Sequence, residues 1–162
     1  LLNSSAARLR EALEFSKANG LPCYETFQPE YNMYNREKFE TEYAPLVQQE
    51  GIGVISYYAL ASGFLSGKYR KPEDADKSPR GSGVVQKYVN ERGLRILAAL
   101  DAVAERYASS LTSVTLAWTM AQPGITAPIA SATDVAQLDE ILKAASLHLD
   151  GDALAQLTEA SA

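Results

Sequence analysis

Hydrophobic positions along the chain alternate between two patterns, one typical of amphipathic helices and the other of buried strands. The helical spacing predicts helices from Ala6 to the Asn19-Gly20 stop and over 37–49, 94–108, 112–121, 135–145 and 151–160. Compact β-branched or aromatic runs predict strands over 21–28, 51–58 and 125–130. This strand-then-helix order predicts an α/β fold with parallel strands and right-handed crossovers.

Capping residues and a proline indicate where two of the predicted helices begin. Ser4 and Ser5 offer capping oxygens just before the first helix. Pro45 falls inside the second predicted helix, where it is expected to kink the helix or to mark the start of its regular part.

Residues 59–93 show neither pattern and are predicted to form a long loop. A loop of this length inside a compact domain is typically a lid, a binding loop or a partly disordered segment, and a solvated linker is the alternative. Within it, Asp74 and Asp76 are interpreted as a solvated acidic patch rather than a metal site.

Residues 53–69, GVISYYALASGFLSGKY, carry the strongest functional signal. A buried-strand pattern runs there directly into a loop rich in aromatic residues, small residues and glycine. Barrel enzymes place functional groups on loops that follow the carboxyl ends of their strands. The loop after this strand is therefore predicted to face a ligand.

Composition narrows the function classes. The 162 residues are 46% hydrophobic and 22% charged, as in a globular domain with its own core. A net charge of −5, with no basic run beyond Lys68, Arg70 and Lys71, makes nucleic acid an improbable partner. A lone Cys23 and the lack of an apolar run near ~20 residues favour a cytoplasmic protein that does not enter a membrane. Leu1 in place of an initiator Met suggests a trimmed or partial chain.

Four stretches in this order resemble the C-terminal half of an aldo-keto reductase: QPEYN at 28–32, the strand and loop at 53–69, TLAW at 115–118, and APIASATDVAQL at 127–138. That family folds as a (β/α)8 TIM barrel and reduces carbonyls with NADP(H) or, less often, NAD(H). A complete barrel takes roughly 250 residues. The resemblance therefore implies that residues 1–162 form the C-terminal half of a barrel, with parallel strands and outer helices.

The resemblance implies three residues around the nicotinamide ring. Asn3 and Gln28 match the family's amides that bind the carboxamide, although Leu2 replaces a serine that usually precedes the asparagine. Tyr57 matches the aromatic residue that stacks on the ring. The alternatives are a helix cap or disordered end for Asn3, a structural hydrogen bond for Gln28, and core packing for Tyr57. Tyr58 is expected in the core or the pocket wall.

Further matches lie along the rest of the cofactor. Leu60, Ser62, Gly63 and Leu65 match the segment that follows the pyrophosphate. Ser131, Thr133, Gln137 and Glu140 match the turn that receives the adenosine 2′-phosphate, although many members carry Gly and Arg where this chain has Ser131 and Thr133. Phosphate binding would then depend on backbone amides, hydroxyls and Arg80 or Lys68. NADP(H) is favoured, with NAD(H) as the alternative, and a surface helix face is the alternative for Glu140.

The family's catalytic tyrosine, lysine, aspartate and histidine lie in its N-terminal half, so the resemblance supplies no catalytic residue here. Two interpretations stay open. The chain is the cofactor-binding half of a carbonyl-reducing oxidoreductase, or it is a non-catalytic nucleotide-binding or structural fragment similar to the family's potassium-channel β subunits. Because half a barrel leaves sheet edges exposed, its expected partner is the missing N-terminal half or a second copy.

Overall fold

The computed structural model describes residues 4–162. Asn3, with its expected cofactor role, lies outside the described residues. The helices and strands are α1 Ala6–Ala18, β1 Thr26–Phe27, a π-helix Phe39–Tyr43, α2 Ala44–Glu50, β2 Gly53–Ser56, 3-10 helices Ala61–Ser66 and Pro72–Lys77, α3 Gly81–Tyr88, α4 Glu91–Arg106, α5 Leu111–Met120, β3 Ala127–Pro128, α6 Val135–Ala144 and α7 Gly151–Ala160.

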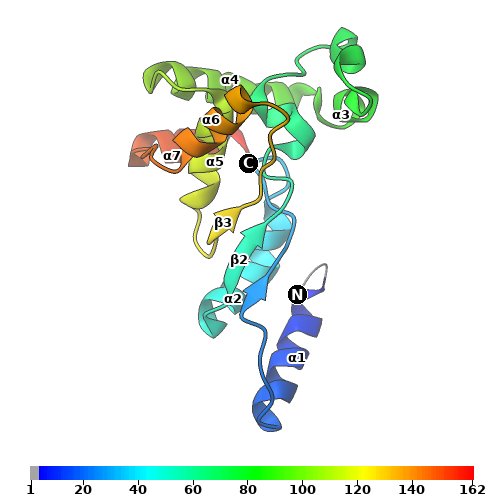
Figure 1. The fold of residues 1–162 in the computed structure, drawn as a ribbon, viewed down its shortest axis with the longest axis vertical. Helices are drawn as coiled ribbons and strands as arrows, with labels where there is room; N and C mark the ends of the chain where they lie inside the picture. Colours follow the sequence, from blue (N-terminus) through cyan, green and yellow to red (C-terminus); the bar gives the residue numbers. More distant parts are fainter. Residues whose placement is uncertain (1–3) are drawn as a thin grey trace.

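The three strands form one parallel sheet in the order β1-β2-β3, as the alternating pattern predicted (Figure 1). Thr26 pairs with Gly53, and Ile55 pairs with Ala127. Each strand is shorter than predicted, β1 most of all: residues 21–25 are exposed and fall outside the strand. Hydrophobic composition there does not produce a strand, because a strand is defined by hydrogen bonds to a neighbour.

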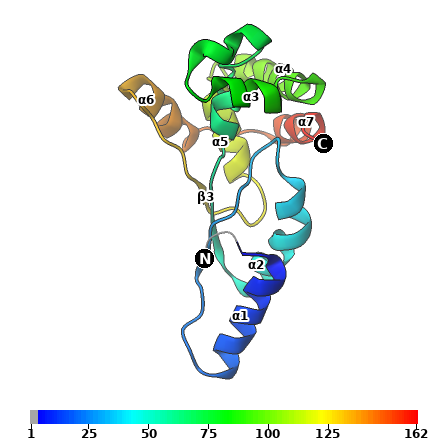
Figure 2. The ribbon, with the colours of Figure 1, turned by 90° about the vertical axis from the view of Figure 1, so that its right-hand side faces the viewer.

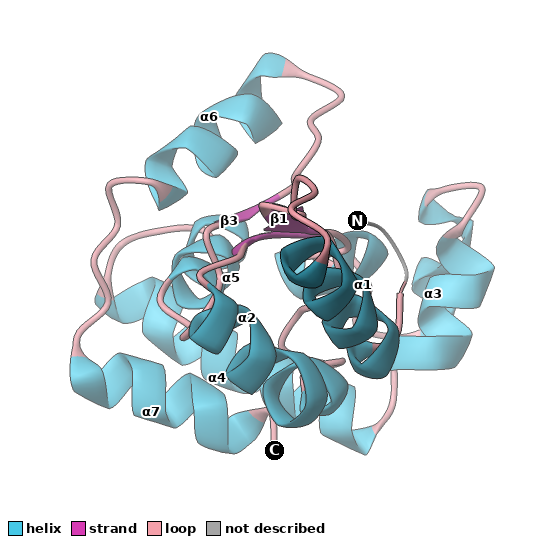
Figure 3. Cartoon of the chain, turned by 90° about the horizontal axis from the view of Figure 1, so that it is seen from below, coloured by secondary structure: helices cyan, strands magenta, loops and turns pink. Residues whose placement is uncertain are grey.

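Helices cover the two faces of this sheet unequally. Helices α1, α2 and α5 lie on one side of it, while α6 stands on the other (Figures 2 and 3). Along β2, Val54 and Ser56 are buried, whereas Gly53 and Ile55 are only half-buried. The sequence predicted a strand covered on both faces, and the structure instead leaves the second face partly open.

Most helix boundaries follow capping residues. The side chain of Ser5 accepts a hydrogen bond from the Arg8 backbone N–H, which confirms the predicted cap of α1. Pro45 lies in the first turn of α2, just after the π-helix, so it marks where the regular helix begins.

None of the helices described within residues 4–162 is long and apolar enough to cross a membrane.

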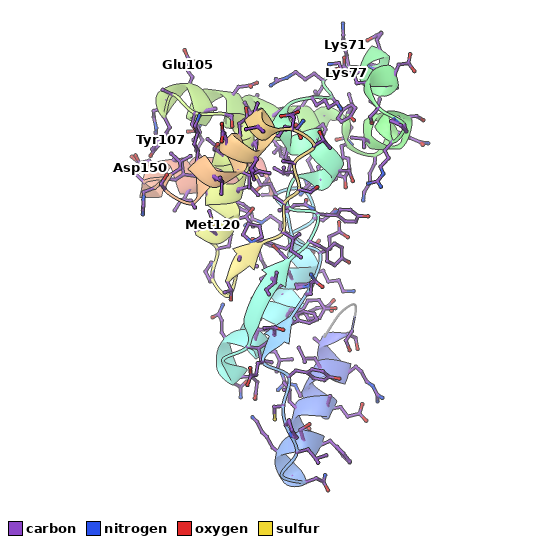
Figure 4. All side chains as sticks on the ribbon, in the orientation of Figure 1. Lys71, Lys77, Glu105, Tyr107, Met120 and Asp150 are labelled. Atoms are coloured by element: carbon purple, nitrogen blue, oxygen red, sulfur yellow. The ribbon has the colours of Figure 1, made fainter. Side chains whose placement is uncertain are left out.

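Polar contacts fix how α7 lies against α4. Near the start of α7, the Asp150 backbone N–H donates to the Tyr107 hydroxyl at 2.9 Å, and Arg106 pairs with the Asp150 carboxylate at 2.7 Å. Figure 4 shows Tyr107 and Asp150 lying close together at the end of this helix pair. The last helix therefore packs onto the same layer as α4 and α5.

Segment 59–93 is not the structureless loop that its pattern predicted. It contains both 3-10 helices, all of α3 and the first residues of α4, with Lys71 and Lys77 flanking its tip (Figure 4). Asp74 is buried rather than solvated, because its carboxylate accepts hydrogen bonds from the Arg70 and Lys71 backbones and pairs with Lys77 at 3.0 Å. The predicted acidic patch is therefore wrong at Asp74, which organises this turn.

Gly93 lies where α4 meets the end of α3, and a Cβ there would be 1.9 Å from the Tyr88 carbonyl oxygen. Gly93→Ala is expected to destabilise the fold by roughly 1–3 kcal/mol, because backbone must move to admit the methyl group. Gly83→Ala is the matched control, since nothing lies within 4 Å of its Cβ, and it should be neutral or stabilising. Equal urea midpoints for the two variants would contradict the close packing at Gly93.

Hydrogen bonds from the Arg70 backbone, then the Lys77 ammonium, lower the pKa of the Asp74 carboxyl. Its ionised form is therefore favoured in the fold, and this stabilisation is present above its ordinary pKa of about 4 and lost as the pH falls through the lower folded value. Asp74→Asn should reduce the urea midpoint at pH 7, and the difference from wild type should close progressively in acid. Asp76→Asn, at an exposed neighbouring position, is the matched control and should leave the urea midpoint at pH 7 close to that of wild type.

Candidate functional site

A cavity of about 630 Å³ lies beyond the carboxyl ends of β2 and β3. Three parts of the chain form it: residues 57–69, the Arg80 region, and residues 129–141 with the start of α5. Its lining residues are Tyr57, Tyr58, Ala59, Leu60, Ser62, Gly63, Ser66, Lys68, Tyr69, Arg80, Thr112, Ile129, Ala130, Ser131, Thr133, Gln137, Glu140 and Ile141. Most of the residues predicted for the cofactor are thus brought to one cavity.

Two tyrosines stand where β2 ends. The rings of Tyr57 and Tyr58 lie 5.2 Å apart at 68°, and Tyr58 is 53% exposed, so it forms the wall rather than the core. Burial, followed by the charge of Glu30, raises the pKa of the Tyr57 phenol. Tyr57 therefore stays protonated at neutral pH and is a weaker acid than a solvated tyrosine, which suits a ring surface better than a proton donor.

The loop after Tyr58 has an unusual backbone. Ala61, Ser62 and Gly63 have positive φ values of 48°, 57° and 87°. Hydrogen bonds from the Gly63 and Leu65 amides to the Leu60 carbonyl, at 2.9 and 3.2 Å, close this tight turn. A Cβ at Gly63 would meet only the Tyr69 ring, at 3.8 Å. Residue 63 therefore leaves space for a ligand to approach the backbone.

Two cationic side chains line the cavity next to this loop. Lys68 Nζ lies 5.5 Å from the centre of the Tyr69 ring, and Arg80 precedes α3. A hydrogen bond of 2.8 Å between the Tyr69 hydroxyl and Ser78 Oγ joins the segment that carries Lys68 to the segment that carries Arg80. Both side chains are exposed enough to meet an anion.

The opposite wall is the start of α6. Asp134 caps this helix by accepting the Gln137 backbone N–H at 2.9 Å. The Gln137 side chain donates a hydrogen bond to Asp134 at 2.8 Å and accepts one from the Thr133 N–H at 3.1 Å. Both the oxygen and the nitrogen of its amide are therefore hydrogen-bonded within this turn. The Glu140 carbonyl accepts Ser113 Oγ at 2.7 Å, which fastens α6 to α5. Hydrogen bonds thus hold Thr133, Gln137 and Glu140 in place, and with Ser131 they line this wall.

Some predicted residues are not among those lining the cavity. Leu65 is fully buried in the hydrophobic core, where its carbonyl accepts the Thr115 hydroxyl at 3.3 Å. Its side chain is thus a core residue, and the contact of this segment's backbone with a pyrophosphate stays a prediction. Gln28 is half-buried at the end of β1, next to Pro29, whose carbonyl accepts the Tyr57 N–H at 3.0 Å.

The sequence reasoning missed several residues of the cavity wall. Thr112 reaches it from the first turn of α5, and Ile129 from the end of β3. Neither carries a recognisable local signal, since they are ordinary apolar or hydroxyl positions near element ends. Ser66 and Tyr69 lie within the predicted stretch 53–69, although they were not singled out there as site residues.

The arrangement suits an elongated anion with a flat ring. An aromatic pair stands at the end of β2, and Lys68 and Arg80 add two cations to the lining of the same cavity. Within residues 4–162, no group of three His, Cys, Asp or Glu side chains is placed to hold a metal ion.

Comparison with known proteins agrees with these features. The sequence model of the Aldo/keto reductase family matches residues 1–162. A probable voltage-gated potassium channel subunit beta of Arabidopsis thaliana is 35% identical over 121 residues, which cover 72% of this chain and 37% of that protein.

Two bacterial proteins are also similar. L-glyceraldehyde 3-phosphate reductase of Escherichia coli O157:H7 is 30% identical over 138 residues, covering 82% of this chain and 40% of that protein. Protein tas of Escherichia coli K12 is 28% identical over 158 residues, covering 96% of this chain and 45% of that protein. The chain thus spans less than half the length of these relatives, and it belongs to the aldo/keto reductase family.

Proposed function

We propose that these residues are the cofactor-binding, C-terminal half of a (β/α)8 barrel that reduces aldehydes, ketones or sugars with NADP(H). The observation that carries the proposal is the cavity at the strand ends, where an aromatic pair, a glycine-containing turn and two cations meet. Family membership supports the reaction class, because oxidoreductases are among the similar proteins.

The half-barrel part of the proposal is supported by what the sheet leaves open. Three parallel strands cannot close on themselves, and a barrel needs both edges paired. The α6 face bearing Val135, Leu138 and Leu142 is also exposed, with 73% of Val135 and 60% of Leu142 accessible. We propose that an N-terminal half covers this apolar face and pairs with the sheet edges. The length of the relatives supports that occupant.

The residues fit a nicotinamide dinucleotide by size and by chemistry. A cavity of about 630 Å³ lies within the usual range for cofactor sites, roughly 300–1,000 Å³. Tyr57 would stack on the flat nicotinamide and exclude water from one of its faces. Gly63 would let the backbone approach the pyrophosphate. Gln28 is proposed to hold the carboxamide from the neighbouring strand.

The preference for NADP(H) over NAD(H) is proposed from the cations. Arg80 and Lys68 add positive charge to the lining of the cavity, where an additional phosphate would be stabilised. Thr133 adds a hydroxyl on the facing wall. Because the Gln137 amide is bonded within its own turn, the proposed phosphate contacts fall mainly to the two cations.

Reduction of a carbonyl also needs a proton donor, which we propose lies in the part of the barrel beyond these residues. When bound, the cofactor would supply the hydride. Tyr57, whose pKa is raised, keeps its proton and forms the stacking surface. Tyr58 and Ile129, both exposed beside it, would contact the carbonyl substrate.

The exposed free thiol of Cys23 supports placing the protein in the reducing cytoplasm.

A second candidate is a nucleotide-binding module without catalysis, to which the similarity to probable potassium channel β subunits of Arabidopsis thaliana and Oryza sativa lends only weak support. NADPH oxidation with glyceraldehyde, assayed after adding the N-terminal half of L-glyceraldehyde 3-phosphate reductase, distinguishes the two. Turnover would favour the oxidoreductase half. Cofactor binding without turnover would favour the binding module.

The chain is expected to bind NADPH, and Arg80→Ala should weaken the affinity by about tenfold through loss of a charge-assisted contact. Titration monitored by NADPH fluorescence measures this change. Arg10→Ala, an exposed arginine on α1, is the matched control and should leave the affinity unchanged. The proposed cofactor role fails if wild type does not bind, and the role of Arg80 fails if both variants bind alike.

The isolated chain is expected to associate in solution, because its α6 face and sheet edges are exposed. Size-exclusion chromatography with light scattering should give a mass above that of one chain. The double variant Leu138→Lys and Leu142→Lys should shift the mass towards the monomer, whereas Ala155→Lys on the exposed face of α7 should not. A monomeric wild type would contradict the need for a covering half.

A further inference from the structure

Asn32 lies outside the cavity, yet it is fully buried and bonded in two directions. Its Oδ1 accepts the backbone N–H groups of Tyr34 at 2.9 Å and Asn35 at 2.8 Å. Its Nδ2 donates to the Tyr58 carbonyl at 3.1 Å. Because two N–H donors face the oxygen, the amide can take only this orientation.

This side chain prolongs the pairing between β1 and β2. Beyond the regular strands, Tyr57 N–H donates to the Pro29 carbonyl at 3.0 Å, and Tyr31 N–H donates to the Tyr57 carbonyl at 3.3 Å. The backbone of residue 32 turns away at this point to form its own turn. The Asn32 amide then supplies the next donor of the ladder, 26 residues distant in sequence from its acceptor.

The acceptor of that bond is a strained residue. Tyr58 has φ of 56°, in the left-handed region that aromatic side chains seldom adopt. Its carbonyl also accepts the Ala61 N–H at 2.8 Å, which begins the turn of positive φ residues. Two donors from different parts of the chain therefore hold one carbonyl in place.

We infer that Asn32 is a positioning residue for the cofactor cavity: its amide fixes the left-handed Tyr58 and thereby sets the Tyr57–Tyr58 pair and the turn through Gly63. The expected effect of Asn32 on NADPH affinity rests on the proposed function. Its expected effect on the backbone of the loop does not depend on that proposal. Asn32 itself is not among the residues lining the cavity. Its loss should loosen the cavity wall without removing a direct contact.

Asn32→Asp tests this role, since it keeps an oxygen for the Tyr34 and Asn35 amides but removes the donor to Tyr58. Peptide-resolved amide exchange should accelerate about tenfold over residues 58–63, and NADPH affinity should fall about tenfold. Asp150→Ala, which removes the cap of α7 far from the cavity, is the control for general destabilisation. It should change neither measurement.

The two readouts separate the possible failures. If wild type does not bind NADPH, the proposed function is wrong, and exchange over 58–63 still decides the role of Asn32. Unchanged exchange in a folded Asn32→Asp protein, or equal acceleration in Asp150→Ala, would overturn the inference. If Asn32→Asp does not fold, Asn32→Ser replaces it, because serine leaves no charge in the core and cannot span to the Tyr58 carbonyl.

Discussion

The central strand β2 is the constraint on which the candidate site depends, because it alone has a hydrogen-bonded neighbour on each edge within the described sheet. Gly53 N–H donates to the Glu25 carbonyl at 2.9 Å on one side, and Ile129 N–H donates to the Ser56 carbonyl at 2.7 Å on the other. These bonds fix where the loops after β2 and β3 begin. Residues 57–69 and 129–133 can therefore face each other across a cavity, although neither loop is regular.

A buried cluster beneath the end of β1 gives those loops a rigid support. The Tyr31 ring stacks on Trp118 of α5, with centroids 5.9 Å apart and planes at 11°. Trp118 donates to Thr158 of α7 at 3.1 Å, and the Arg36 guanidinium lies 5.4 Å from the indole ring. Burial, then the bond to Glu40, raises the pKa of Tyr31, so its phenol remains a donor. Tyr31, the residue before Asn32, thus contacts α5 and the π-helix, and Trp118 joins this cluster to α7.

The helices could be predicted from sequence because their signals are local. An apolar stripe and a capping side chain suffice, and the predicted bounds of α7 match the observed Gly151–Ala160. The strands were predicted too long, since the extent of a strand is set by partners that the pattern does not contain. Helix α3, Gly81–Tyr88, was missed because it spans barely two turns, and only Val84 and Tyr88 mark its buried side besides Gly81. Asp74 is buried because the surrounding turn brings backbone N–H donors to its carboxylate. The composition of the segment does not reveal those donors.

In the candidate site, too, some residues could be predicted from local sequence signals, whereas others depend on contacts that the sequence does not reveal. Tyr57 could be placed at the cavity because it directly follows β2, and Glu140 because it lies on α6, the helix after β3. Leu65 could not, because the chain reverses through left-handed residues before reaching it. Glycine indicates such a reversal at 63, but Ala61 and Tyr58 adopt positive φ with no sign in the sequence. The Tyr58 carbonyl accepts a hydrogen bond from Asn32, outside the loop, and one from Ala61 within it, and such contacts are what hold a strained backbone in place. Under the proposed function, the orientation of the cofactor loop is therefore encoded partly in Asn32, a residue that does not line the cavity.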